Sequence, residues 1–92
     1  MYISFPRKIR GRANRLSISI PKSICEDYDI QPDDFLSVTI EDKPKNPELR
    51  IRFPKKVARA GTEGRLIYLR KKDVEKYGLK RNTVVLVTLE EA

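Results

Sequence analysis

The chain has 92 residues, of which 39% are hydrophobic and 36% charged, a composition typical of one soluble folded domain with a modest core. It has one cysteine and no histidine, which excludes an intramolecular disulfide, a zinc site and any mechanism that needs imidazole. The formal net charge is +7, and no apolar run approaches the roughly 18 residues of a membrane span, so we expect a cytoplasmic protein without a membrane segment.

The first two predicted elements are β-strands. The stretch YISFPRKIR at 2–10 alternates apolar and polar residues around a proline, which is typical of a strand at a sheet edge or with a bulge. The stretch RLSISI alternates strictly, with Leu16, Ile18 and Ile20 on one face and serines on the other. This pattern predicts a half-buried strand.

A short helix, a turn and a closing strand are predicted next. Pro21 fits the first turn of a helix, where its missing N–H is not needed, so PKSICEDY is expected to be helical. QPDD is typical of a turn, and the apolar stretch FLSVTI is typical of a strand. The order of elements up to this point is β-β-α-β.

The same order returns in the second half of the chain, where the helix RKKDVEKYG ends at Gly78, a residue suited to a left-handed cap. The colinear matches are ISFPRKI with IRFPKKV, GRANRL with GTEGRL, KSICEDYDI with KKDVEKYGL, and VTIE with VTLE. We therefore predict a single domain, 1–92, built from two β-β-α-β repeats at about 2–41 and 49–90 that are joined by a linker at 42–48.

The charges are segregated along the chain. Residues 1–16 contain five basic residues and no acid, whereas residues 17–41 contain one lysine against six acids. Residues 48–72 are again basic, with nine Lys and Arg against two Glu. A fold that brings the two basic segments together has one strongly positive face.

The stretch IPKSICEDYDIQPDDFLSVTIED resembles the AbrB-like transcription-factor domain, whose units run from Ile-Pro-Lys through a short helix and a Pro-Gly-Asp-like turn to an apolar strand. The matching positions are Ile20, Pro21, Lys22, Ile24, Ile30, Pro32 and Asp34. The second repeat is similar through Leu69, Lys71, Tyr77, Gly78 and Leu79. It departs from the pattern at Arg70, where the family has proline, and at Asp73, where the family has an apolar residue.

The resemblance implies a fold. AbrB-like domains normally carry one unit per chain and interlock two chains, whereas here both units lie in one chain. This points to the related cradle-loop barrels, of the RIFT or the double-psi type. Because each repeat has an extra leading strand and the linker is short, we predict the RIFT type: a mostly β, monomeric protein with a closed six-stranded β-barrel, two short helices and internal pseudo-two-fold symmetry.

The resemblance also implies a function. In the similar transcription factors, basic residues of the first strand and the following loop bind DNA. The matching positions here are Arg7, Lys8, Arg10, Arg12 and Arg15 in the first repeat, and Lys55, Lys56, Arg59 and Arg65 in the second. The chain is therefore predicted to be a duplex DNA-binding transcriptional regulator, not an enzyme, with no cofactor and no metal.

Three alternatives remain open at this point. The basic residues can be a solvated surface without a ligand. The chain can be an antitoxin-like interaction module whose positive face docks an acidic protein. It can also be a nucleotide- or flavin-related enzyme of the RIFT-barrel type, although it has no glycine-rich phosphate loop and no histidine.

Overall fold

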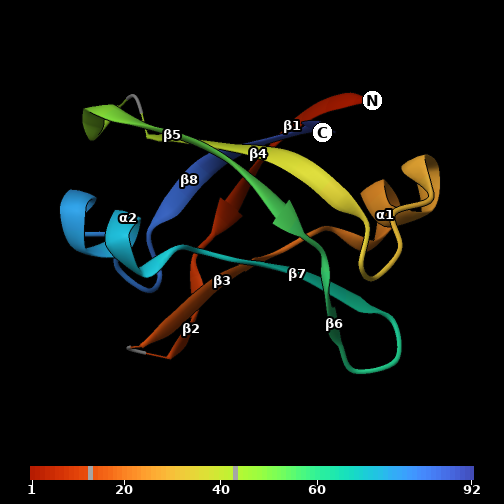
Figure 1. Cartoon of the computed structure of the whole chain (residues 1–92). Coiled ribbons are helices and arrows are strands. Elements are labelled where there is room, and N and C mark those ends of the chain that lie inside the picture. The colour runs from red at the N-terminus through yellow and green to blue at the C-terminus, as the bar shows by residue number, and fades with distance from the viewer. Residues whose placement is uncertain (13, 43) are drawn as a thin grey trace.

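The computed structural model describes residues 1–12, 14–42 and 44–92 (Figure 1). These residues form eight β-strands and two short α-helices. In chain order the elements are β1 (Tyr2–Lys8), β2 (Arg10–Arg12), β3 (Arg15–Ser19), α1 (Lys22–Tyr28), β4 (Phe35–Asp42), β5 (Asn46–Lys56), β6 (Ala58–Ala60), β7 (Gly64–Tyr68), α2 (Lys71–Tyr77) and β8 (Val84–Glu91).

The described strands form two antiparallel sheets of four strands each. The first sheet has the order β1-β8-β4-β5 and the second the order β2-β3-β7-β6. Only Ile9 separates β1 from β2, and only Val57 separates β5 from β6. Both residues are almost fully buried, at 0% and 1% exposure. The leading strand of each repeat therefore bends at a buried residue and passes from one sheet to the other.

The predicted closed six-stranded barrel of the RIFT type is wrong. Within the described ranges neither sheet closes on itself, because β1 and β5 are the edges of the first sheet and β2 and β6 the edges of the second. The physical reason is the bend at Ile9 and Val57, which divides each leading strand into a long and a short segment with different partners. The fold is mostly β with two short helices.

The two halves of the chain occupy equivalent places in both sheets. β1 pairs with β8 as β5 pairs with β4, and the register agrees residue by residue, with Tyr2 opposite Glu90 and Arg50 opposite Glu41. The buried residue at each bend also makes an equivalent backbone hydrogen bond. The N–H of Ile9 donates to the carbonyl of Thr83 at 2.8 Å. The N–H of Val57 donates to the carbonyl of Asp34, also at 2.8 Å.

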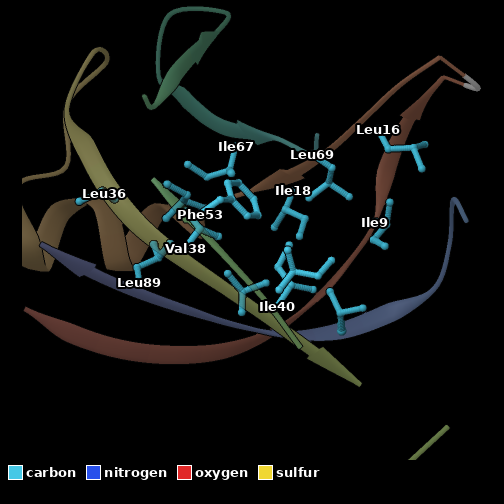
Figure 2. Close-up of a cluster of buried hydrophobic side chains, with 14 of the residues drawn as sticks. Ile9, Leu16, Ile18, Leu36, Val38, Ile40, Phe53, Ile67, Leu69 and Leu89 are labelled. Atoms are coloured by element: carbon cyan, nitrogen blue, oxygen red, sulfur yellow. The ribbon is translucent and has the colours of Figure 1, made fainter. Parts of the chain in front are cut away.

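The hydrophobic core lies between the two sheets. Ile18 of β3 and Ile67 of β7 are direct cross-strand partners, and both are fully buried. Figure 2 shows them together with Phe53 and with side chains of the first sheet such as Val38 and Ile40. Burying each of these aliphatic side chains contributes about 1.5–3 kcal/mol, so this interior stabilises the arrangement of both sheets.

The alignment of the repeats through β3 and β7 differs by one residue from the one that the sequence suggests. The sequence alignment of GRANRL with GTEGRL matches Leu16 with Leu66. In the structure, however, the N–H of Ile20 donates to the carbonyl of Arg65 at 2.9 Å, and the N–H of Leu69 donates to that of Leu16 at 3.0 Å. Leu16 is therefore the structural equivalent of Arg65. The Arg-Leu pair that both repeats share in sequence does not occupy equivalent positions in the structure.

The two helices span seven residues each and end in left-handed caps. The caps are Asp29, with φ 51°, and Gly78, with φ 61°, and their N–H groups donate to the carbonyls of Cys25 and Val74. No helix in the described ranges has the length and apolar character needed to cross a bilayer.

The predicted linker at 42–48 is mostly part of a β-hairpin. β4 runs to Asp42 and β5 begins at Asn46, and these two residues are paired. Lys43 lies outside the described residues. The connection between the repeats is therefore a turn between neighbouring strands of the first sheet.

Candidate nucleic-acid interface

Three of the predicted DNA-binding residues lie together on the outer face of the second sheet. Arg10 is opposite Ser17, and Arg12 is opposite Arg15, in the β2–β3 pair. Cross-strand partners and alternate residues share a face, and Ile18 faces the core, so these three arginines face away from it. All three are exposed. We call Arg10, Arg12 and Arg15 the hairpin cluster.

An aromatic ring of the neighbouring strand orients one member of this cluster. The guanidinium carbon of Arg15 lies 4.2 Å from the centroid of the Tyr68 ring on β7. A cation–π contact at an exposed site is worth about 0.5–1 kcal/mol, and it leaves the N–H groups at the edge of the guanidinium plane available to a ligand. The outer face therefore presents Arg15 in a defined orientation.

The second hairpin has no such cluster. Under the pseudo-two-fold relation, the positions of Arg12 and Arg15 are taken by Ala60 and Gly64, which are likewise cross-strand partners. The position of Arg10 is taken by Ala58. The outer face of the second sheet is thus basic over its first half and uncharged over its second half.

The predicted residues Arg59 and Arg65 belong to the opposite side of the β6–β7 pair. They are cross-strand partners. Arg59 lies between Ala58 and Ala60 in β6, and successive side chains of a strand point to opposite faces. Arg65 donates hydrogen bonds to the carbonyl of Ile30 at 3.3 Å, to that of Gly64 at 3.0 Å and to Oε1 of Gln31 at 3.5 Å. Arg65 therefore fixes the segment that follows α1, whereas Arg59 is exposed.

Arg7 joins two strands near the point where the leading strand passes from the first sheet to the second. Its Nε lies 2.9 Å from the carbonyl oxygen and 3.1 Å from Oγ of Ser19, and its Nη2 lies 2.8 Å from the same Oγ. The guanidinium of Arg7 thus joins β1 to the end of β3. Lys55, at the equivalent position, is half-buried and forms no hydrogen bond or ion pair with another described residue.

Lys8 and Lys56 belong to the first sheet. Both are exposed, opposite Val84 and Phe35 respectively. Both therefore lie on the outer face of that sheet and not with the hairpin cluster. The structure does not bring the nine predicted residues onto one surface.

Each hairpin lies beside the helix of the other repeat. A hollow lined by Asn14, Lys71 and Glu75 separates the β2–β3 hairpin from α2, and a larger one lined by Thr62, Glu63 and Lys22 separates the β6–β7 hairpin from α1. Figure 1 shows the same arrangement, with α1 and α2 on opposite sides of the molecule. The charge of each end therefore depends on one hairpin and one helix together.

The two ends have different charges. The basic end, formed by the β2–β3 hairpin and α2, carries Arg10, Arg12, Arg15, Lys71, Lys72 and Lys76 against Asp73 and Glu75. The mixed end, formed by the β6–β7 hairpin and α1, carries Lys22, Arg59 and Arg65 against Glu26, Asp27, Asp29 and Glu63. At the mixed end, Nζ of Lys22 pairs with Glu63 at 3.2 Å. Only the basic end has a clear excess of positive charge.

The prediction from sequence omitted the lysines of α2. Lys71, Lys72 and Lys76 are all exposed. In α1 the positions of Lys72 and Lys76 are taken by Ser23 and Asp27. A comparison of the charges of the two helices, position by position, would have identified α2 as the basic one.

Cys25 borders the hollow at the mixed end and is half-buried. Burial raises the pKa of its thiol, and the nearby charge of Arg65 lowers the pKa in part. No group of three or more His, Cys, Asp or Glu residues suited to a metal ion occurs among the described residues.

No protein-family model matches the chain, and a search of curated proteins found no match to its sequence.

Proposed function

We propose that the protein is a duplex DNA-binding transcriptional regulator, related to AbrB-like factors, that binds DNA as a monomer through its basic end. One observation carries the proposal. Six exposed cations of the β2–β3 hairpin and α2 lie at one end, and none of them forms an ion pair with another described residue. Asp73 is paired with Arg70, so Glu75 is the one other acid of these elements, and the end keeps an excess of positive charge that is available to a polyanion.

Phosphate neutralisation explains why such an end binds nucleic acid. Each Lys or Arg that contacts a phosphate releases condensed counterions, so affinity falls with salt by roughly 0.9 slope units per contact on duplex DNA. Arginines such as those of the hairpin cluster donate two parallel N–H bonds to one phosphate. This term acts on any sequence and fixes the position of the protein on the duplex.

The distribution of aromatic side chains favours a duplex over single strands. Proteins that bind single strands stack bases on exposed aromatic rings. Here Phe5 and Phe53 are buried in the core, and the Tyr68 ring is covered by Arg15. The exposed rings of Tyr28 and Phe35 border a different hollow, together with Asp34. The most exposed ring, Tyr2, belongs to β1 of the first sheet, and Tyr77 of α2 is half-buried with Lys76 near its face. The basic end therefore offers exposed charges but no fully exposed ring on which a base could stack.

The second-repeat residues Lys55, Lys56, Arg59 and Arg65 are not part of this proposed surface. Arg65 is engaged with the segment after α1 and borders a hollow that Glu26, Asp29 and Glu63 also line, and Arg59 is its cross-strand partner. The proposed footprint is therefore asymmetric, although the backbone is pseudo-symmetric.

The test is retention of a labelled duplex over a salt series. We expect affinity to fall steeply with salt in the wild type, and Arg10→Gln with Arg12→Gln to lower the slope by roughly two units. The matched control, Lys55→Gln with Lys56→Gln, removes the same charge and should leave the slope near that of the wild type.

Two results would contradict the proposal. Equal losses of salt slope in both variants would show that residues of both repeats contact the DNA. A wild type that retains no duplex at low salt, yet binds poly-glutamate with the same salt dependence, would identify the basic end as a dock for an acidic protein.

A further inference from the structure

A basic hollow lies between α2 and the first half of β5. Its volume is about 360 Å³. Its cationic lining residues are Arg50, Arg52, Arg70, Lys72 and Lys76. Asp73 is the only acid among the described residues that line it.

The one acid of this hollow is already neutralised. Asp73 is buried, at 6% exposure, and its Oδ2 accepts a hydrogen bond from Nε of Arg70 at 2.6 Å. The guanidinium of Arg70 also lies over the ring of Phe53, 4.8 Å from its centroid. Arg70 and Asp73 therefore form an internal pair, and the other four cations determine the charge of the hollow.

These four cations are only weakly engaged. Arg50 and Arg52 approach Glu41 and Glu90 at 3.9 and 3.8 Å, and Nε of Arg52 lies 3.1 Å from Oγ of Ser37. Both arginine side chains remain mostly exposed, at 71% and 61%, and such surface pairs are worth at most about 1 kcal/mol.

The two lysines of the hollow are freer still. Within the described residues Lys72 and Lys76 have no acidic partner, although Lys76 lies 5.3 Å from the centroid of the Tyr77 ring. The four cations can therefore turn toward an anion at little cost.

The charge of this hollow is not a requirement of the scaffold. In the first repeat the equivalents of Arg50 and Arg52 are Tyr2 and Ser4. Those of Lys72 and Lys76 are Ser23 and Asp27. The same backbone folds without these cations, so folding does not account for their presence.

We propose that this hollow holds a backbone phosphate of the same duplex that the hairpin cluster contacts, an inference that rests on the proposed function. Lys72 belongs to α2, which lies between the β2–β3 hairpin and β5, so both cationic groups belong to one end of the molecule. The DNA backbone then runs from the hairpin cluster across α2 to β5, and it does not reach the second hairpin.

The test compares two variants with the same loss of charge. Lys72→Gln with Lys76→Gln removes two cations from the hollow and keeps most of each aliphatic stem, and Lys22→Gln with Lys56→Gln is the matched control. We expect the hollow variant to lower the salt slope of duplex binding by roughly one to two units, and the control to leave it unchanged. Circular dichroism checks that both variants are folded.

If the wild type binds duplex and the hollow variant keeps its full slope, the phosphate site in the hollow is wrong, and the proposed function then rests on the hairpin cluster and Lys71 alone. A titration with tripolyphosphate, followed by NMR, tests the hollow without DNA. We expect the largest shifts at α2 and β5, and we expect them to disappear in the hollow variant. Equal shifts at the control lysines would overturn the phosphate site. If these shifts occur but no duplex binds, DNA is excluded as the source of the phosphate.

Discussion

The two hairpins of the second sheet have the same backbone and different surfaces. β2–β3 presents arginine at three outer positions, whereas β6–β7 presents two alanines and a glycine at the equivalent positions. Ile18 and Ile67 are fully buried in equivalent places, although Arg65 lies where the first hairpin has the buried Leu16. The two hairpins therefore share a buried isoleucine at their centre and differ in the charge of their outer faces.

The helices differ in the same sense. α1 contains one lysine and two acids, whereas α2 contains three lysines and two acids, one of them buried. Because each hairpin lies beside the helix of the other repeat, a basic hairpin and a basic helix meet at one end of the molecule. Symmetry of the backbone therefore does not imply symmetry of surface charge.

The largest expected effect tests the common interior of the repeats. Ile18→Ala and Ile67→Ala each remove a fully buried side chain and should lower the free energy of unfolding by about 2–5 kcal/mol. Because these residues are cross-strand partners in equivalent places, we expect similar losses. Denaturant unfolding measures both. A difference of more than about 2 kcal/mol would show that the two halves do not share the core equally.

Much of the fold is readable from local sequence. Strict alternation in RLSISI predicts a half-buried strand, and the structure has β3 there with Leu16 and Ile18 buried, but Ser17 of the other face is buried as well, at 5% exposure. Gly78 is predicted as a left-handed cap and adopts φ 61°. The bend of the leading strands is not readable, because Ile9 and Val57 are ordinary strand residues whose partners lie far away in sequence. The division into two sheets follows from that bend.

The site was predicted less completely than the fold. The segregation of charge does identify the hairpin cluster, whose three arginines are exposed. The sequence could not show that Arg7 and Arg65 form hydrogen bonds within the protein. Their acceptors are oxygens of Ser19, Ile30 and Gln31, and backbone, hydroxyl and amide oxygens of this kind occur along every protein chain, so they give no specific signal in the sequence. It also aligned Arg15 with Arg65, although the two side chains lie on opposite sides of the sheet.

An intermediate effect tests the hydrogen bonds by which Arg7 joins β1 to β3. Arg7→Ala removes a half-buried guanidinium that makes three short contacts with Ser19, so we expect a loss of about 1.5 kcal/mol in the free energy of unfolding. Lys55→Ala, at the equivalent position, should cost less than about 0.5 kcal/mol. Thermal and denaturant unfolding decide between them.

The charge of Arg7 can be separated from its hydrogen bonds. Arg7→Lys keeps the charge and loses the planar fork, so it should lower stability nearly as much as Arg7→Ala and leave the salt slope of duplex binding unchanged. If Arg7→Ala were as stable as the wild type but lost a full slope unit, Arg7 would be a phosphate contact and not a structural tie.

The smallest expected effect concerns the two helix caps. Both have positive φ, which costs an L-residue more than glycine, so Gly78→Ala should lower the free energy of unfolding by about 1 kcal/mol. Asp29→Gly should raise it by about 0.5 kcal/mol or less, because Asp tolerates this conformation and its Oδ1 accepts a hydrogen bond from Nε2 of Gln31 at 2.7 Å. Denaturant unfolding of both variants measures the difference. If Asp29→Gly were clearly destabilising, the contact with Gln31 would outweigh the backbone strain, and the first repeat would have replaced the glycine cap by a side-chain hydrogen bond of its own.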